Sequence, residues 1–517
     1  MLSRVWSSAT HGVDALPIEI ETNIDGGIPR YTVVGLPQGA VRESRDRIWA
    51  ALKNNNLPVP RGAITINLAP ADVRKEGSAF DLPLAIGLMA AGTEAIAQTR
   101  LDRFWLMGEL SLDGTVRPVN GVLPMAIKAR AEGRSGVVVP VKNAAEAAVV
   151  DGLTVYPVAS VTDAFALLAN GAGGTAPAPY HRDTEALFDE ARTYPIDFSD
   201  VRGQENVKRA LEVAAAGGHN ALMVGPPGSG KTMLARRMPT ILPPLTTDEA
   251  LETTKIHSVS GKLRNTKHGI VARRPFRSPH HTISDAGLRG GGANPSPGEI
   301  SQAHNGVLFL DELPEFKRSV LEVLRQPLEE GRITISRAQS TVEFPARFML
   351  LASMNPCPCG HLNDPNRECV CAPAHVQRYL SKISGPLMDR FDLHVEVAPV
   401  PFDELNDRAP GEASTAVRDR VMAARAVQDE RFAENEGVYC NAQMGARLVQ
   451  ESCVLDDAGQ HLLKMAIERL GLSARAYTRI LKVARTVADL AASPSIEPTH
   501  VSEAIQYRSL DRDWWHG

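Results

Sequence analysis

Apolar residues recur with two periodicities along the chain, the alternation typical of strands and the longer repeat typical of helices. These periodicities divide the chain into regions of different predicted structure. From residue 1 to about 170, alternating runs such as Ile18–Thr22 and Tyr31–Val34 predict strands, and the repeat in Val41–Asn54 predicts a helix. Beyond Pro401 the helical repeat dominates. We therefore expect an α/β protein that begins with an α+β domain and ends in a bundle of helices.

A run rich in glycine and proline, Asn170–Tyr180, separates the first region from the next. It is typical of a linker, although an ordinary surface loop has the same composition. The length of 517 residues also exceeds what one hydrophobic core usually serves. We predict four segments: an N-terminal domain (1–170), a linker (171–195), a nucleotide-binding core with a parallel sheet (196–400) and a C-terminal helical lid (401–517).

A phosphate-binding loop follows the apolar run Ala221–Val224, which predicts a buried strand. The loop matches G-x-x-x-x-G-K-[ST] and consists of Gly225, Pro226, Pro227, Gly228, Ser229, Gly230, Lys231 and Thr232. Its glycines let backbone N–H groups surround phosphate oxygens. Lys231 is predicted to reach the β- and γ-phosphates and Thr232 to bind Mg²⁺, so ATP and Mg²⁺ are the expected cofactors.

A second motif supplies the carboxylates that ATP hydrolysis needs. Val307–Leu310 is apolar throughout, as in a central parallel strand, and ends in Asp311 and Glu312. Ligands of parallel sheets lie at the carboxyl ends of the strands. Asp311 is therefore expected to hold Mg²⁺ and Glu312 to polarise the attacking water.

Longer motifs resemble one family of AAA+ ATPases. Phe276–Gly292, Pro297–Ser301, Ala303–Leu313, Met354–Gly360 and Ser384–Asp392 resemble segments of the Mg-chelatase-like family of competence protein ComM, also called YifB, in the helix-2-insert group. The resemblance runs essentially from end to end. It implies an ATP-driven ring, expected to be a hexamer, that acts as a helicase on single-stranded or branched DNA independently of sequence. Branch migration in homologous recombination during natural transformation is the implied task.

The same resemblance assigns roles to residues outside the two motifs. Asn355 is expected to be the sensor-1 residue, and Arg390 the arginine finger offered to a neighbouring subunit. A structural ion pair with a neighbouring aspartate is the alternative for Arg390. Arg475 resembles sensor 2 on the lid, and Arg479, one helical turn on, is the alternative. The predicted catalytic residues are Lys231, Asp311, Glu312, Asn355, Arg390 and Arg475.

Two inserts are expected to form the surface that contacts DNA. The stretch 289–298 has too many glycines and prolines for regular structure, and by resemblance it belongs to the helix-2 insert facing the ring pore. Ile333–Phe344 alternates like a hairpin and resembles the pre-sensor-1 hairpin. Arg289, Arg332 and Arg337 are candidates for contacts with the DNA backbone, although arginines that contact only solvent are common on surfaces.

Four of the six cysteines fall within one short stretch: Cys357, Cys359, Cys369 and Cys371. They can supply four thiolates to one tetrahedral Zn²⁺, and His361 or His375 can replace one of them. Each pair has one intervening residue where common zinc knuckles have two or more. Packed thiols, a redox pair and an Fe–S cluster therefore remain alternatives to the zinc ion that we predict.

The N-terminal region resembles the Lon-protease-like domain, of ribosomal-protein-S5-like fold, found in this family. The resemblance covers Lys75–Asp81 and Gly108–Pro124. It puts Ala79 where Lon-type proteases carry the nucleophilic serine and Pro124 where they carry the catalytic lysine. Neither can act in a Ser-Lys pair, and Ser78 is one position off. We therefore predict a catalytically inactive assembly or binding module.

Composition and charge limit how the protein could bind nucleic acid and where in the cell we expect it. The formal net charge of -4 argues against coating of nucleic acid by bulk positive charge, so DNA contacts must come from local basic loops. The sequence shows neither a leader pattern nor a bilayer-spanning run, and we expect a cytoplasmic protein with no membrane partner. The alternatives to a DNA motor are an Mg-chelatase subunit that drives metal insertion, a Lon-like protease, and a ring that remodels a protein complex.

Overall fold

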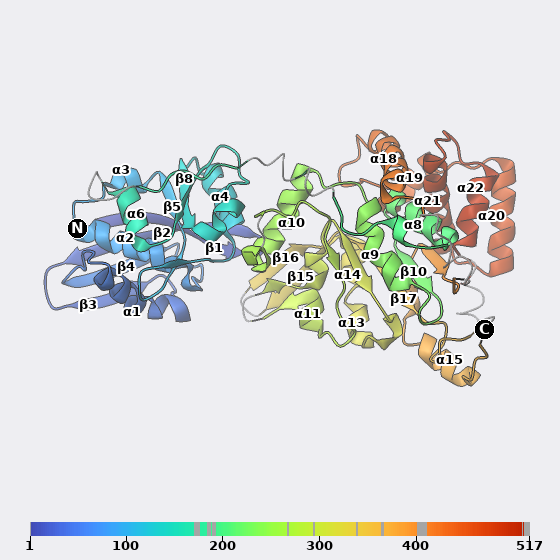
Figure 1. Ribbon diagram of the computed structural model, residues 1–517, viewed down its shortest axis with the longest axis horizontal. Coiled ribbons are helices and arrows are strands. Elements are labelled where there is room, and N and C mark those ends of the chain that lie inside the picture. Colours follow the sequence, from blue (N-terminus) through green and yellow to red (C-terminus); the bar gives the residue numbers. More distant parts are fainter. Residues whose placement is uncertain are drawn as a thin grey trace.

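Two α/β units and a helical lid lie in a row along the long axis of the molecule (Figure 1). The computed structural model describes residues 2–169, 176–182, 188, 193–265, 268–292, 295–337, 340–362, 367–400, 411–508 and 510. The N-terminal unit lies at one end and the lid at the other, with the central unit, which we call the ATPase core after its predicted activity, between them. The predicted α/β class, with a parallel ATPase sheet and a helical lid, is confirmed.

The N-terminal unit is built on a seven-stranded mixed sheet in the order β3-β4-β2-β1-β5-β8-β9. Its strands are β1 (Leu2–His11), β2 (Asp14–Asp25), β3 (Arg30–Val34), β4 (Ala63–Ala69), β5 (Phe104–Leu106), β8 (Gly136–Pro140) and β9 (Thr154–Val158), with a small separate pair β6 (Glu109–Leu110) and β7 (Val116–Arg117). Its helices are α1 (Gly39–Asn54), α2 (Asp81–Gly92), α3 (Gln98–Leu101), α4 (Val122–Ala131), α5 (Ala144–Ala147) and α6 (Val161–Leu168). Helices α2 and α4 pack against β1 and β2, and α1 packs against α2.

Strand β1 is the one long element of this unit that the sequence pattern did not indicate. It pairs with β2 in register over its whole length. Its inward positions include Ser3 and Ser7 beside Val5, so apolar alternation is broken although the strand is buried. A strand with buried serines does not give the apolar and polar alternation from which strands are recognised.

Part of the predicted linker 171–195 lies outside the described residues. Within it, the backbone N–H of Tyr180 donates to the carbonyl oxygen of Val155 at 2.8 Å. This contact covers the outer edge of β9, which ends the seven-stranded sheet on that side.

The ATPase core contains five parallel strands in the order β11-β14-β17-β10-β18. They are β10 (Ala221–Val224), β11 (Phe276–Arg277), β14 (Val307–Leu310), β17 (Met349–Met354) and β18 (Leu393–Glu396). Alternate residues of β10 enter different hydrophobic clusters: Met223 packs with α8 (Glu205–Gly217) and α9 (Lys231–Ile241), and Leu222 packs on the other face. Both faces are covered, which explains the uniformly apolar strands.

The other helices of the core, apart from the one at Thr247–Val259, are short. They are α10 (Thr247–Val259), α11 (Asp285–Arg289), α12 (Glu299–Gln302), α13 (Arg318–Glu322), α14 (Arg325–Glu330), α15 (Pro373–Leu380) and α16 (Gly385–Met388). The predicted hairpin is confirmed as β15 (Arg332–Arg337) and β16 (Ser340–Pro345), and residues 338–339 at its tip lie outside the described residues. The prediction that 289–298 lacks regular structure is wrong, because β12 (Gly290–Gly291) pairs with β13 (Ser296–Pro297).

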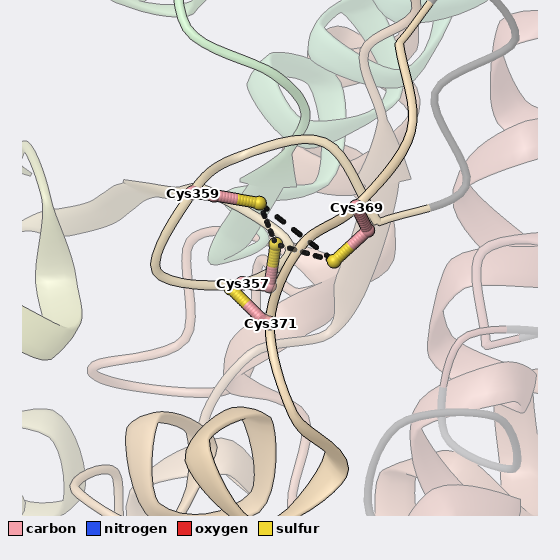
Figure 2. A group of neighbouring side chains, drawn as sticks. All are labelled: Cys357, Cys359, Cys369 and Cys371. Atoms are coloured by element: carbon pink, nitrogen blue, oxygen red, sulfur yellow. Dashed lines mark hydrogen bonds between the residues drawn. The ribbon is translucent and has the colours of Figure 1, made fainter.

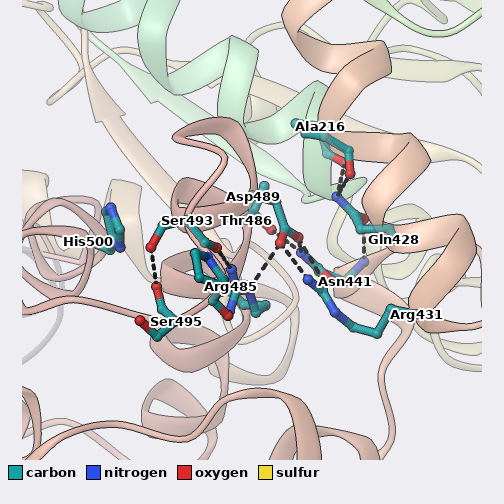
Figure 3. Close-up of polar contacts among 12 residues, drawn as sticks. Ala216, Gln428, Arg431, Asn441, Arg485, Thr486, Asp489, Ser493, Ser495 and His500 are labelled. Atoms are coloured by element: carbon teal, nitrogen blue, oxygen red, sulfur yellow. Dashed lines mark hydrogen bonds and ion pairs between the residues drawn. The ribbon is translucent and has the colours of Figure 1, made fainter.

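The lid consists of α18 (Ser414–Arg431), α19 (Ala446–Ser452), α20 (Asp457–Leu470), α21 (Ala474–Leu490) and α22 (Pro498–Gln506). A buried polar network holds it together around Asp489, which accepts from Arg431 Nη2 at 2.6 Å and Asn441 Nδ2 at 2.8 Å (Figure 3). Gln428 Nε2 donates to the carbonyl oxygen of Ala216 on α8 at 3.1 Å. The lid is therefore fixed to the core of its own subunit. In the part of the chain that the structure describes, none of the helices combines the length and the apolar composition that a membrane span requires.

The N-terminal unit and the ATPase core share one hydrophobic cluster. It combines Trp105, Val137 and Val155 of the first with Leu245, Ala250 and Ile270 of the second. At one side of this cluster, Lys255 Nζ lies 3.2 Å from Asp14 Oδ1, and the turn at Gly12 lies against Val342 of the hairpin. The N-terminal unit is thus packed firmly on the core.

A buried carboxylate, Glu146, crosses this boundary, and its removal should destabilise both units together. It accepts from the Leu123 N–H at 2.9 Å and from Asn143 Nδ2 at 3.0 Å, and it also accepts from Ser258 Oγ on α10. Burial raises the pKa of Glu146. Glu146→Ala should lower the free energy of unfolding by about 1–3 kcal/mol, because it leaves buried donors unsatisfied. Calorimetric unfolding should show one transition at lower temperature, whereas a loss confined to an independently melting N-terminal unit would contradict the shared core.

Candidate functional site

The phosphate loop connects the end of β10 to the start of α9. Gly230 caps α9 with φ +90°, a conformation that residues with a side chain rarely adopt. The chain therefore turns directly from the strand into the helix, and the first N–H groups of α9 point back into the loop. A helix start of this kind favours bound anions such as phosphate.

Lys231 is the first residue of α9, and its side chain folds back across the phosphate loop. Its Nζ donates to the carbonyl oxygens of Gly225 and Pro226, both at 2.8 Å, and lies 3.4 Å from Asn355 Oδ1. Burial lowers the pKa of Lys231 to about 8, and the negative charge of Asp311 opposes this shift. A buried ammonium whose partners here are neutral carbonyl, hydroxyl and amide oxygens is well suited to a phosphate partner, so the loop fits ATP.

The lowered pKa of Lys231 predicts a pH dependence of nucleotide binding. Below about 8 the side chain is charged, and above it the side chain is increasingly neutral. Because an anionic phosphate prefers the charged form, affinity for ATP should fall as the pH rises from 7 to 9.5, and binding above pH 8 should take up a proton. Calorimetry in two buffers of different ionisation enthalpy measures this uptake. An affinity that is flat over this range, with no proton uptake, would contradict the prediction.

Thr232 and Asp311 meet at the mouth of the loop. Thr232 Oγ1 donates to Asp311 Oδ2 at 2.6 Å, and Ser353 Oγ on β17 donates to Asp311 Oδ1. The phosphate loop and the acidic motif, far apart in sequence, thus form one site. A hydroxyl and a carboxylate oxygen in contact are the oxygen ligands that Mg²⁺ uses in nucleotide sites, so these residues fit the ion.

Glu312 points toward solvent beside the same site. Its backbone has φ +54°, and its side chain is 58% exposed. Its Oε2 lies 3.3 Å from His281 Nδ1, and the His281 ring lies 4.1 Å from that of His280, between centroids. Sequence reasoning gave His281 no role, although a histidine pair just beyond β11, which lies next to β14, is a signal that could have pointed to it.

The predicted residues of the ATP site therefore gather at one edge of the sheet. Asn355 follows the last residue of β17, Asp311 and Glu312 follow β14, and the phosphate loop follows β10. These three strands are neighbours and parallel, so their carboxyl ends lie together.

Arg390 lies at the opposite edge of the sheet. It precedes β18, which is parallel to β10, so it stands at the amino ends of the strands. Its guanidinium forms an ion pair with Glu329 on α14 rather than with Asp389 or Asp392, the partners expected for a structural ion pair. Sequence reasoning missed Glu329, which precedes Arg390 by a long stretch of chain.

Both sensor-2 candidates on α21 reach the same edge as Arg390. Arg475 Nη1 lies 3.0 Å from Asp389 Oδ2, and Arg479 Nη1 lies 2.9 Å from Asp392 Oδ1. Burial, together with the charges of Arg479 and Arg475, lowers the pKa of Arg390.

These three arginines line one cavity of about 1180 Å³ between the core and the lid. Of the described residues, no member of the phosphate loop lines it. One subunit thus carries a phosphate loop at one edge of its sheet and a group of cations at the other.

The candidates for DNA contact lie on two inserts that touch each other. Arg289, at the end of α11, donates to the carbonyl oxygen of Thr334 on β15 and so ties the helix-2 insert to the hairpin. Arg332 Nη1 lies 3.3 Å from Glu343 Oε2 in a half-exposed pair. Arg337 is exposed at the end of β15. Arg332 and Arg337 are therefore both exposed, and Arg289 holds the surface together.

The four clustered cysteines converge on one point (Figure 2). The sulfur of Cys357 lies 3.4 Å from that of Cys359 and 3.7 Å from that of Cys369, and all four ligand atoms lie within 4.8 Å of one another. Tetrahedral Zn–S bonds of about 2.3 Å place sulfurs about 3.8 Å apart, so the thiols fit zinc. A four-iron cluster would hold its thiolates farther apart, because each binds a different iron.

One thiol of the cluster ionises more readily than two of the others. The backbone N–H of His361 is the main cause that lowers the pKa of the Cys359 thiol to about 6, whereas burial and hydrogen bonds with neighbouring thiols raise the pKa values of Cys369 and Cys371. In the described part of the chain, the converging group contains cysteines alone, so neither His361 nor His375 is needed as a ligand. The separations are also far longer than a disulfide bond of about 2.05 Å.

The N-terminal unit carries no serine–lysine pair among its described side chains at the aligned position. Ser78 Oγ donates to Glu109, and Pro124 is buried in the first turn of α4. Lys75 is also buried, donates to the carbonyl oxygen of Pro70, and has its pKa lowered by burial. The geometry gives Ser78 no lysine as a proton acceptor.

Three family models match the chain. Their descriptions are "Subunit ChlI of Mg-chelatase" for residues 20–143, "Magnesium chelatase, subunit ChlI" for residues 197–405, and "Magnesium chelatase, subunit ChlI C-terminal" for residues 411–508. The matches fall in turn on the N-terminal unit, the ATPase core and the lid.

Several relatives match over almost the whole chain, among them the following two. The competence protein ComM of Haemophilus influenzae is 43% identical over 512 residues, which are 99% of this chain and 98% of the relative. The uncharacterized protein YifB of Escherichia coli is 44% identical over 512 residues, with the same coverage. The magnesium-chelatase 38 kDa subunit of Rhodobacter capsulatus is 25% identical over 185 residues, which are only 32% of this chain.

Proposed function

The chain belongs to the Mg-chelatase-like AAA+ family that includes ComM and YifB, and from this premise we propose that it is a ring-forming DNA motor. In this proposal it hydrolyses Mg²⁺-ATP, assembles as a hexamer and promotes branch migration in homologous recombination during natural transformation. A cytoplasmic location is part of the proposal, since ATP and reduced thiols are available there.

One observation carries the ring proposal: the two groups of catalytic candidates lie at opposite edges of the same sheet. Lys231 and Asp311 are at one edge, and Arg390 and Arg475 are at the other. In a head-to-tail ring, one edge of each subunit meets the opposite edge of the next, so each ATP site is completed by a neighbour. A guanidinium supplied in this way stabilises the charge that develops on the transferred phosphate.

Within the site, each side chain has a separate task. Lys231 and the N–H groups at the start of α9 bind and orient the phosphates. Thr232 and Asp311 would hold Mg²⁺, which neutralises phosphate charge when bound. Glu312 polarises the attacking water, and Asn355 keeps that water and the phosphate aligned.

The DNA part of the proposal is supported by the paired inserts and by the name of the relative ComM, a competence protein. Arg337 is exposed, and the hairpin that carries it packs against the helix-2 insert. Contacts to backbone phosphates from such a surface suit binding that is independent of sequence.

The proposal is tested with forked DNA and a mobile four-way junction. DNA should stimulate ATP hydrolysis, and hydrolysis should drive strand exchange at the junction. Arg337→Ala should weaken DNA binding and reduce the slope of log K against log salt by about 1, since one phosphate contact is lost. Arg447→Ala, at an 88% exposed lid position, is the matched control and should leave the slope unchanged. ATP hydrolysis without DNA binding at low salt would exclude the DNA motor and favour a protein-remodelling or chelatase-type ATPase.

A further inference from the structure

The cysteine cluster lies directly against the phosphate loop. Backbone atoms join the two segments, since the N–H of Gly225 donates to the carbonyl oxygen of Met354 at 3.2 Å. The chain then continues through Asn355, whose Oδ1 is 3.4 Å from Lys231 Nζ, and reaches Cys357 two residues later. The ATP-site residue and the first thiol are thus neighbours on one short segment.

The turn that contains the first two thiols also presses on the loop from the side. The N–H of Gly360 donates to the carbonyl oxygen of Cys357 at 3.0 Å and closes the turn. Gly360 has φ +85°, and a Cβ added to it would lie 2.8 Å from Pro227 Cγ and closer still to Pro227 Cδ. Only glycine fits this contact, so the cysteine turn forms a wall of the phosphate loop.

The second pair of thiols, Cys369 and Cys371, returns to the cluster and leads directly into α15. This helix begins two residues after Cys371, and near its end it buries Tyr379. Burial raises the pKa of Tyr379, and a hydrogen bond from the Asn355 backbone opposes that shift. Helix α15, which follows the cysteine segment, therefore contacts the Asn355 backbone, and the turn at Gly360 contacts Pro227.

We propose that a zinc ion bound by Cys357, Cys359, Cys369 and Cys371 braces the phosphate loop, so that zinc occupancy sets the affinity for nucleotide. Four thiolates on one ion hold the two chain segments that carry them, 357–359 and 369–371, at one point. The fixed turn holds Gly360 against Pro227 and Asn355 near Lys231. The inference rests on the nucleotide site of the proposed function and is independent of DNA.

Thermodynamic linkage makes this coupling reciprocal. If zinc raises nucleotide affinity by some factor, nucleotide must raise zinc affinity by the same factor. Coupling between sites is commonly about 5–150-fold, and contact as direct as that between Gly360 and Pro227 should give about tenfold. Nucleotide should therefore slow the loss of zinc to a chelator.

The test uses the full chain without DNA, with zinc content and the Kd for a fluorescent ATP analogue measured side by side. The purified protein should hold one zinc per chain. Removal of zinc should weaken nucleotide binding about tenfold, and added zinc should restore it. Gly360→Ala should weaken binding similarly while all four thiols remain and zinc content is unchanged. Cys453→Ala, at a buried thiol on the lid, is the control that should change neither quantity.

Two results would overturn the inference. One is a protein with intact cysteines that holds far less than one zinc per chain. The other is a fully zinc-loaded Gly360→Ala variant whose nucleotide affinity equals that of the parent. Gly360→Ala keeps the test decisive even if the zinc-free protein unfolds, since it retains the metal. If the protein passes both tests but does not bind DNA, only the proposed function as a DNA motor is contradicted, and the inference about zinc stands.

Discussion

Arg390→Ala is expected to bind ATP with unchanged affinity and to hydrolyse it about 1,000-fold more slowly or worse. Arg390 lies at the amino ends of the strands, and the phosphate loop of the same subunit lies at their carboxyl ends. The substitution therefore leaves the nucleotide-binding site of that subunit intact. What is lost is the guanidinium offered to a neighbour. Steady-state hydrolysis and the Kd for ATP, measured on assembled protein, give the two quantities.

A mixture of two inactive variants separates action between subunits from action within one. Lys231→Ala removes the phosphate contact but keeps Arg390, and Arg390→Ala does the reverse. In randomly mixed rings, about a quarter of the interfaces combine an intact lysine with an intact arginine, so part of the activity should return. If mixing restores nothing although mixed rings are shown to form, Arg390 does not act on a neighbour.

Variants of nearby groups control for packing. Arg390 is mostly buried and forms an ion pair with Glu329. Arg390→Lys keeps a positive charge at this position but removes the planar guanidinium group and its several hydrogen-bond donors. It should fold like the parent and recover little hydrolysis. Arg447→Ala on the exposed lid surface should keep full activity.

The sequence predicted the parts of the fold in which one short segment contains all the information. Val307–Leu310 and Ala221–Val224 are apolar because both faces of the sheet are covered, and such runs are visible without knowledge of the neighbours. The lid helices likewise follow from their own periodicity. Strand β1 was missed because Ser3 and Ser7 are buried by partners that come from elsewhere in the chain.

The candidate site divides in the same way. The motif residues were identified because the phosphate loop is one continuous segment and its chemistry requires those residue types. Three partners were not identified: Ser353 on Asp311, His281 on Glu312, and Glu329 on Arg390. Each comes from a different element, and only the strand order and the placement of α14 bring it near. Pairing across elements is a property of the fold rather than of a local pattern.

Glu312→Gln should lower the rate of ATP hydrolysis by about 10²–10⁴-fold with little change in nucleotide affinity. Glutamine has the same shape, yet its neutral amide cannot accept a proton from the attacking water. The side chain is 58% exposed, and Asp311, rather than Glu312, holds Thr232 and Ser353. The substitution should therefore leave the Mg²⁺-binding residues in place.

The neighbouring carboxylates give Glu312→Gln its controls. Asp311→Asn removes the negative charge and one of the two oxygens that accept from Thr232 and Ser353, so it should raise the Mg²⁺ requirement, and binding and hydrolysis should fail together. Glu315→Gln changes a half-exposed carboxylate three residues on, whose ion pair with Lys382 is 3.6 Å long, and should stay within about twofold of the parent. Single-turnover hydrolysis separates these variants from effects on product release. If Glu312→Gln hydrolyses bound ATP as fast as Glu315→Gln does, the water is polarised by another group, and His281, 3.3 Å from Glu312, is the next side chain to change.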